Sequence, residues 1–99
     1  DDEKNIPINF HLSQNYPNPF NPTTTINFSV PKNQMIKIEV FDLQGRLINT
    51  VYERITQPGQ HTVRWDANDY NHNSIPSGVY FYRLTSEKYF KTRKMLYLK

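Results

Sequence analysis

Apolar and polar residues alternate along several stretches of the chain, and this period of two is typical of half-buried β-strands. The clearest stretch is Thr24–Val30, in which Ile26, Phe28 and Val30 alternate with polar residues until Pro31 ends the pattern. Short segments rich in Gly, Pro, Asn, Asp and Ser separate the stretches. The pattern predicts seven strands and no helix, at Ile8–Gln14, Thr24–Val30, Met35–Asp42, Leu47–Ile55, Gln60–Asp66, Gly78–Ser86 and Tyr89–Leu98.

Two connections in this pattern carry further predictions. The turn Lys32–Gln34 is short, so Met35–Asp42 is expected to return as the antiparallel hairpin partner of Thr24–Val30. Leu47–Ile55 also fits one face of a helix, but β-branched residues dominate it and a Pro-Gly pair closes it, which favours a strand. In the turn before that strand, Gly45 is expected to adopt a positive φ.

Alternation also assigns the residues of each strand to two faces. Trp65, the only tryptophan, is expected to be the central core residue. The predicted faces are Ile8, Phe10 and Leu12 in the first strand; Ile36, Ile38 and Val40 in the third; Leu47, Val51 and Ile55 in the fourth; His61, Val63 and Trp65 in the fifth; and, in the seventh, Phe90, Leu96 and Leu98 against Met95 and Tyr97.

A proline-rich segment, Asn15–Pro22, precedes the clearest strand and is called the strap below. Its prolines Pro17, Pro19 and Pro22 lack a backbone N–H, have a fixed φ and push the preceding residue out of the α region. Neither a helix nor a central strand fits that spacing, so an extended, polyproline-like segment with turns is expected. Phe20 has no polar reason to lie there and is expected to insert into the core.

The strand count and spacing predict an all-β fold, an immunoglobulin-like antiparallel β-sandwich of about seven strands. A length of 99 residues allows one domain with a modest core. The chain is 36% hydrophobic and 14% aromatic, which indicates a folded domain rather than a disordered tail. It has no cysteine, which excludes disulfides, thiolate metal sites and cysteine nucleophiles.

The net charge of the chain is +3, and positive charge is concentrated near its end. One interpretation is a solvated face that protects an edge strand, and the other is a docking surface. An RRM motif and a basic helix are both missing from the sequence, so a nucleic-acid partner is not expected. The cations are Arg83, Lys88, Lys91, Arg93, Lys94 and Lys99.

The start of the chain is polar, and residues 1–7 are expected to be a linker, with the folded domain at residues 8–99. The sequence shows no charged-then-apolar leader. No apolar run approaches the ~18 residues of a membrane helix, so a membrane-embedded protein is not expected. The polar start and the strand at the end favour a C-terminal piece of a larger protein.

No cluster of residues indicates catalysis, and the chain is not expected to be an enzyme or to bind a cofactor. Three histidines, His11, His61 and His72, lie in separate segments without metal-ligand spacing. The loop after Trp65 offers oxygen ligands for calcium, although turn formation is the favoured role of such residues. The weak calcium candidates are Asp66, Asn68, Asp69 and Asn71.

Four tyrosines in the last two predicted strands raise carbohydrate binding as a second possible function. An aromatic platform of this kind binds sugars in some modules, while the alternative is that the rings pack in the strands and the hydroxyls reach water. A retained accessory module of a secreted enzyme, which binds carbohydrate or packs against a catalytic domain, is therefore the alternative function. The tyrosines are Tyr80, Tyr82, Tyr89 and Tyr97.

Five segments together resemble a known family. They are QNYPNPFNPTTTINFSVP (14–31), VFDLQGRLI (40–48), PGQHTVRWDAND (58–69), SGVYFYRL (77–84) and KTRKMLYLK (91–99). In this order they resemble the type A C-terminal sorting domain of the type IX secretion system. The region WD…SGVYFYR is also similar to the immunoglobulin-like domain of flagellar hook-capping proteins.

The resemblance implies a function: such domains direct a cargo protein across the outer membrane of Gram-negative bacteria, from the periplasm to the cell surface or the medium. The implied partners are the type IX translocon with its outer-membrane shuttle, a sortase-like surface peptidase that cuts near or before residues 1–7, and the upstream cargo domain. The implied recognition residues are Asn15, Pro17, Asn18, Pro19, Phe20, Asn21 and Pro22 in the strap, Gly45 and Arg46 in the middle turn, Gly78, Tyr80 and Arg83 in the aromatic strand, and Lys91, Arg93, Lys94 and Lys99 at the end.

Two positions depart from the family pattern, because Ala67 and the segment Asn71–Asn73 stand where the family has glycine. Asparagine tolerates the left-handed region, so the loop is expected to keep its path. The last strand is further expected to present unpaired backbone groups, which a partner could read by edge pairing.

Overall fold

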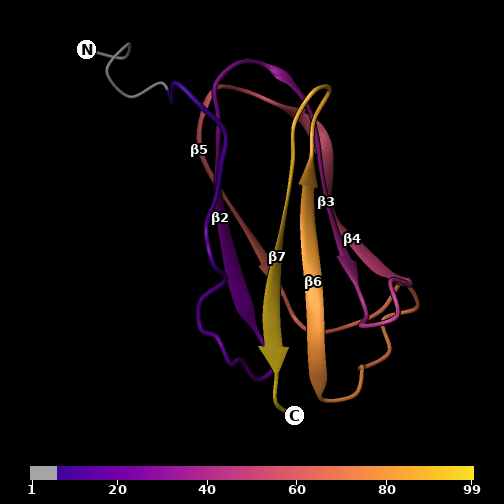
Figure 1. The fold of residues 1–99 in the computed structure, drawn as a ribbon. Coiled ribbons are helices and arrows are strands. Elements are labelled where there is room, and N and C mark those ends of the chain that lie inside the picture. The colour runs from indigo at the N-terminus through magenta and orange to yellow at the C-terminus, as the bar shows by residue number, and fades with distance from the viewer. Residues whose placement is uncertain (1–6) are drawn as a thin grey trace.

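The computed structural model describes residues 7–99 and consists of two packed β-sheets (Figure 1). One sheet has the strand order β1-β2-β5 and the other the order β4-β3-β6-β7, with antiparallel neighbours throughout. This confirms the predicted all-β, immunoglobulin-like sandwich of seven strands. The strands are β1 (His11–Leu12), β2 (Thr24–Val30), β3 (Gln34–Phe41), β4 (Leu47–Thr56), β5 (Gly59–Trp65), β6 (Gly78–Thr85) and β7 (Phe90–Tyr97).

The core lies between the two sheets and is built from alternate residues of the long strands. Its members are almost completely shielded from solvent, which confirms the period of two seen in the sequence. Trp65 at the end of β5 is part of this core, as predicted. The central members are Ile26, Phe28 and Val30 from β2, Ile36, Ile38 and Val40 from β3, Tyr80, Tyr82 and Leu84 from β6, and Met95 and Tyr97 from β7.

The predicted hairpin of β2 with β3 is wrong, because the two strands lie in different sheets. β2 pairs with β1 and β5, while β3 pairs with β4 and β6. The link between them crosses the sandwich from one sheet to the other, and the residues at its two ends, Val30 and Gln34, are both buried. Pro31 directly after β2 has no N–H with which to continue a ladder, so the chain leaves the sheet there.

The first strand is shorter than predicted. β1 spans only His11–Leu12 and pairs with the end of β2. Leu12 is buried, but Ile8 is 90% exposed and Phe10 is half-buried, with its ring stacked on Tyr89 at 4.5 Å between centroids. The alternating sequence pattern thus extends further toward the N-terminus than the part of the segment that is buried in the core. The predicted linker, except for its last residue, lies outside the described residues.

The predicted apolar face of the fourth strand is also wrong in part. β4 is a strand rather than a helix, but Leu47 and Ile55 are exposed. Two shifts in the register with β3 leave Ile48 and Val51 as extra residues in β4, and both pack against the core. A β-bulge of this kind inserts one residue and so moves the following side chains to the other face. No helix in the described part of the chain has the length and hydrophobicity needed to cross a membrane.

Candidate functional site: the last strand and the strap

The last strand, β7, lies at an edge of the four-stranded sheet (Figure 1). It pairs with β6 over its whole length, from the pair Thr85 and Phe90 to the pair Gly78 and Tyr97. In an antiparallel strand, alternate residues direct their backbone groups to opposite sides. The edge of β7 that faces away from β6 is therefore the surface on which another segment can pair.

The strap occupies the C-terminal half of this edge. The Phe20 N–H donates to the Leu96 carbonyl and the Leu98 N–H donates to the Phe20 carbonyl, each at 3.1 Å, so that Phe20 forms a parallel bridge with Tyr97. The side-chain oxygen of Asn18 accepts from the Leu96 N–H at 3.0 Å. The expectation of unpaired backbone groups in the last strand is therefore wrong for this half of β7, because the strap supplies their partners.

Phe20 fixes the strap to the core, as the sequence predicts. Its side chain is 2% exposed and lies against two rings, with centroid distances of 5.1 Å to Tyr97 and 5.9 Å to Trp65. The rest of the strap bends on both sides of Phe20, in line with the turns expected in this segment. Its exposed members are Tyr16, Pro17, Asn18, Pro19, Asn21 and Pro22.

A second anchor holds the beginning of the strap. The buried Asn15 donates from its side-chain nitrogen to Thr24 Oγ1 at 2.9 Å and to the Pro17 carbonyl at 3.1 Å. Its backbone N–H donates to the Tyr82 hydroxyl at 2.8 Å, and that hydroxyl donates to the Ser13 carbonyl at 2.6 Å. Burial raises the pKa of Tyr82 to about 12. Sequence reasoning missed this role of Tyr82, because only the fold brings β6 to the strap.

The cations at the end of the chain do not form a single cluster. Lys91, Lys94 and Lys99 are exposed, whereas Arg93 is half-buried and donates from Nε to the Leu12 carbonyl at 2.6 Å. Arg93 thereby ties β7 to β1 across the side of the sandwich. Alternation directs Lys94 to the outer face of the sheet and Lys91 to the side of Arg93.

The outer face of the same sheet also carries Arg83. Its guanidinium lies 5.0 Å from the centroid of the Phe41 ring, and its Nε donates to Thr92 Oγ1 at 3.3 Å. Because Phe81 pairs with Lys94 in the register of β6 and β7, Lys94 is close to this group. Arg83 and Lys94 are thus the two implied recognition residues that the sheet brings together on its outer face.

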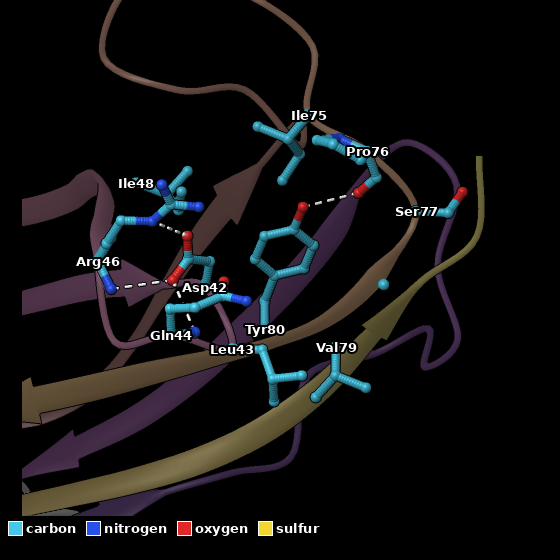
Figure 2. A pocket seen from close by; sticks show the side chains of 11 residues that line it. Asp42, Leu43, Gln44, Arg46, Ile48, Ile75, Pro76, Ser77, Val79 and Tyr80 are labelled. Carbon is cyan, nitrogen blue, oxygen red and sulfur yellow. Dashed lines mark hydrogen bonds and ion pairs between the residues drawn. The ribbon is translucent and has the colours of Figure 1, made fainter.

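The middle turn is held by one carboxylate. Asp42 Oδ1 accepts from the backbone N–H groups of Gln44 at 3.0 Å and Arg46 at 2.9 Å, and Oδ2 accepts from Arg46 Nε at 2.8 Å (Figure 2). Burial alone would raise the pKa of Asp42, but the hydrogen bonds and charge of Arg46 and the bond from Gln44 hold it below its usual value. Gly45 has a φ of 85°, as predicted for this turn.

Beside the turn lies a cavity of about 310 Å³ that brings several implied recognition residues together (Figure 2). Arg46 comes from the turn, while Gly78 and Tyr80 come from β6. The Tyr80 hydroxyl donates to the Pro76 carbonyl at 2.7 Å, and burial raises the pKa of Tyr80. Sequence reasoning missed Asp42, although a carboxylate directly before a Gly-containing turn is a recognisable turn signal.

The loop after Trp65 uses its oxygens within the fold. Asp66 Oδ1 accepts from Thr23 Oγ1 at 3.0 Å, Asn68 accepts from the Trp65 indole N–H, and Asp69 Oδ1 accepts from the backbone N–H groups of Asn71 and Asn73. The contacts of Asn68 and Asp69 are local turn contacts, which was the favoured role, whereas Asp66 joins the loop to Thr23. The calcium site stays a prediction without structural support. Residues 7–99 contain no group of three or more His, Asp or Glu side chains suited to a metal ion.

The same loop shows how the two departures from the family pattern are accommodated. Ala67, which is buried, has a φ of 56°, so alanine adopts the left-handed conformation that glycine would take more readily. In the second departure the positive φ of 64° belongs to His72 and not to an asparagine. The loop thus keeps left-handed positions with residues other than glycine.

The proposed aromatic platform does not form. Tyr80, Tyr82 and Tyr97 are 5%, 0% and 3% exposed, so their rings belong to the core. Tyr89 is half-buried against Phe10. Three of these four tyrosines therefore lie in the core, and the four do not form a shared exposed platform for a sugar ring.

Comparison with known proteins assigns the chain to a family. A family model described as the secretion system C-terminal sorting domain matches residues 14–98. No curated protein gives a significant match. The solved structure of dimeric latent PorU from Porphyromonas gingivalis is similar with a TM-score of 0.72 and 20% identity, covering 90% of this chain and 9% of the PorU chain.

Two further structures share the fold. PorZ of Porphyromonas gingivalis, described as an essential bacterial surface component of the type-IX secretion system, is 24% identical with a TM-score of 0.59, over 87% of this chain and 11% of PorZ. FlgD from Xanthomonas campestris, a protein of hook capping, is 16% identical with a TM-score of 0.62, over 88% of this chain and 64% of FlgD. The chain thus spans only about a tenth of the PorU and PorZ chains, and at these identities the likeness shows the fold alone.

Proposed function

Because the chain belongs to the family of secretion system C-terminal sorting domains, we propose that it directs an attached cargo protein across the outer membrane through the type IX secretion system. The observation that carries the proposal is the family match, which covers the strap and all of β2 to β7. The proposal gives the domain no catalytic step: it acts by being recognised.

The cargo in this proposal is a domain upstream of residues 1–7, and it passes through the periplasm to the cell surface or the medium. The partners are the type IX translocon with its outer-membrane shuttle, and a sortase-like peptidase that cuts the domain off or attaches the cargo to the surface. A cut near or before residues 1–7 is compatible with the fold, because β1 begins at His11 and the core begins at Leu12. Removal upstream would therefore leave the sandwich intact.

Exposed lysines on and after the edge strand support a recognition role for the end of the chain. Lys91, Lys94 and Lys99 are solvent-exposed, so a partner can contact them without unfolding the domain. Exposed charges contribute little to folding stability, which leaves them available to guide association. Arg93 differs, because its bond to the Leu12 carbonyl makes it part of the fold.

The test is export of a fluorescent reporter that carries a signal peptide and residues 1–99, in a host with a type IX system. Deletion of 91–99 is a poor control, since it removes Met95 and Tyr97 from the core and so unfolds the domain. The informative variant is Lys91→Glu/Lys94→Glu/Lys99→Glu, with Arg93 unchanged. Its matched control makes the same change of net charge away from β7, in Lys32→Glu/Arg54→Glu/Arg64→Glu.

We expect the unmodified fusion and the matched control to reach the surface or the medium, and the β7 variant to accumulate in the periplasm. Retention of the unmodified fusion would contradict the sorting function and favour a retained accessory module that packs against its neighbour. Normal export of the β7 variant would leave the sorting function standing but would refute recognition through these charges.

A further inference from the structure

The strap occupies the edge of β7 in the way that an added strand would. It uses the N–H and the carbonyl of Phe20 to pair with Leu96 and Leu98, and it runs parallel to β7 at the bridge with Tyr97. Just before the strap, the Gln14 side chain donates to the Lys94 carbonyl at 2.7 Å. The Lys94 carbonyl, both backbone groups of Leu96 and the N–H of Leu98, which directly follows β7, are thus paired with residues 14–20.

The strap also ends the sheet. Pro19 and Pro22 have no N–H to offer a further strand, and the residues around Phe20 are exposed on the far side. With the strap in place, no partner can add a strand next to the C-terminal half of β7. With the strap displaced, the N–H and carbonyl groups of Leu96, the N–H of Leu98 and the site of the Phe20 ring become available together.

We propose that this covered edge is a strand-binding site, and that an extended peptide segment of the export machinery displaces the strap and pairs parallel to β7. The proposal rests on the proposed sorting function and identifies where the last strand is read. The incoming strand repeats the backbone bonds of Phe20 and places a large apolar side chain in the site of its ring. The bonds lost from the strap are thereby replaced, so the exchange leaves few groups unpaired.

Charge defines the incoming segment further. Lys94 lies at one end of the covered edge, and Lys99 follows its other end, and both are exposed. The described residues place no acidic side chain in a salt bridge with either lysine. An incoming strand with Asp or Glu on either side of its apolar residue would therefore find cations at both ends.

A first experiment locks the strap by a disulfide. Asn21 and Leu98 each follow the bridged pair Phe20 and Tyr97 by one residue, and both are exposed, so Asn21→Cys/Leu98→Cys joins the strap to β7. The chain has no cysteine of its own, so no competing disulfide can form. A second pair, Gln14→Cys/Lys94→Cys, uses the contact just before the strap. The corresponding serine pairs give the reference level of export, and non-reducing gels show which molecules are cross-linked.

We expect export of the cross-linked reporter fusion to fall about tenfold or more below its serine reference, because a locked domain cannot populate the open form. Export of cross-linked molecules at the serine level would overturn the proposal while leaving the sorting function intact. If neither pair cross-links, the closed arrangement from which the proposal starts is refuted. If the unmodified fusion is not exported, it is the sorting function that fails.

A second experiment tests the site directly with a peptide. The probe is a fluorescent copy of residues 14–23, added to the purified 99-residue chain carrying Phe20→Ala, with Phe90→Ala as the control because the Phe90 ring is 71% exposed. In the control the attached strap competes with the probe at a high effective concentration. We expect Phe20→Ala to bind the probe about tenfold or more tightly than Phe90→Ala, and a probe with alanine in place of phenylalanine to lose this gain.

Equal binding of the probe by the two chains would overturn the proposal. Circular dichroism checks that Phe20→Ala is folded under the conditions of the assay. If it is not, Asn18→Ala serves instead, because it keeps Phe20 in the core and removes only the bond to the Leu96 N–H. For that chain we expect probe binding to rise about fivefold over Phe90→Ala, the factor that one hydrogen bond provides, and the absence of any rise would contradict the exchange.

Discussion

Replacing Phe20 by alanine tests how strongly the strap stabilises the sandwich. The ring is 2% exposed and packs on Trp65 and Tyr97, so its removal leaves a cavity between the two sheets at the end of β7. Buried Phe→Ala substitutions cost about 3–5 kcal/mol, from lost transfer free energy and the cavity left behind. Each aromatic pair contributes about 0.5–1.5 kcal/mol of that loss. We therefore expect the free energy of unfolding to fall by about 3 kcal/mol or more.

For a domain of this size such a loss is large. Folded proteins gain roughly 0.05–0.15 kcal/mol per residue, so the whole domain is stable by about 5–15 kcal/mol. A change of 1 kcal/mol shifts the Tm of a domain of this length by about 4–8 °C, so Phe20→Ala should lower it by about 12 °C or more. The assay is thermal and urea unfolding followed by circular dichroism and tryptophan fluorescence, which reports directly on Trp65.

The control for this prediction is Phe90→Ala. It removes the same kind of side chain, but at an exposed position on β7, and such substitutions stay within about 0.5 kcal/mol. A loss below about 1 kcal/mol for Phe20→Ala, with Phe90→Ala unchanged, would refute the reasoning, because it would mean that the strap contributes no buried packing.

Three further substitutions test the anchors and the loop. Tyr82→Phe leaves the Asn15 N–H without its partner and should cost about 1–3 kcal/mol. Folding raises the Tyr82 pKa from 10.0 to about 12, so the contribution of the neutral hydroxyl to stability is complete below pH 10 and is lost as the pH rises toward 12. When unfolding is measured at increasing alkaline pH, Tyr82→Phe should lack this loss of stability. Asp42→Asn removes the negative charge and the oxygen that accepts from Arg46 Nε. Since folding lowers the pKa of Asp42, its contribution to stability exists above its ordinary value of 3.8 and disappears in acid, so the variant should be less stable at neutral pH and less sensitive to acid. His72→Gly should stabilise the domain by up to about 1 kcal/mol, measured as a higher urea midpoint, because His72 is exposed at a φ of 64°; an unchanged or lower midpoint would contradict this.

Local chemistry was enough to predict much of the fold. The apolar faces of β2 and β3, the positive φ of Gly45 and the insertion of Phe20 follow from residues within a few positions of one another. A strand with one buried face must alternate, and a turn that needs positive φ favours glycine, whatever the rest of the chain does. The family resemblance likewise depends on short segments in a fixed order, and the family model matches over residues 14–98.

Local chemistry failed where the answer depends on which segments meet. Alternation tells which residues of a strand face the core but not which strand lies beside it, so the predicted hairpin of β2 with β3 was wrong. The bulges of β4 reversed part of its predicted face, because they arise from its pairing with β3.

The candidate site depended on tertiary structure in the same way. The sequence by itself determined that the strap is proline-rich, that Phe20 is apolar and that the last strand is basic. Only the fold decided that the strap pairs with Leu96 and Leu98, and that Tyr82 holds the start of the strap. These contacts join residues more than 65 positions apart, such as Asn15 with Tyr82. Their formation depends on the stacking of two sheets, which no local pattern of residues specifies.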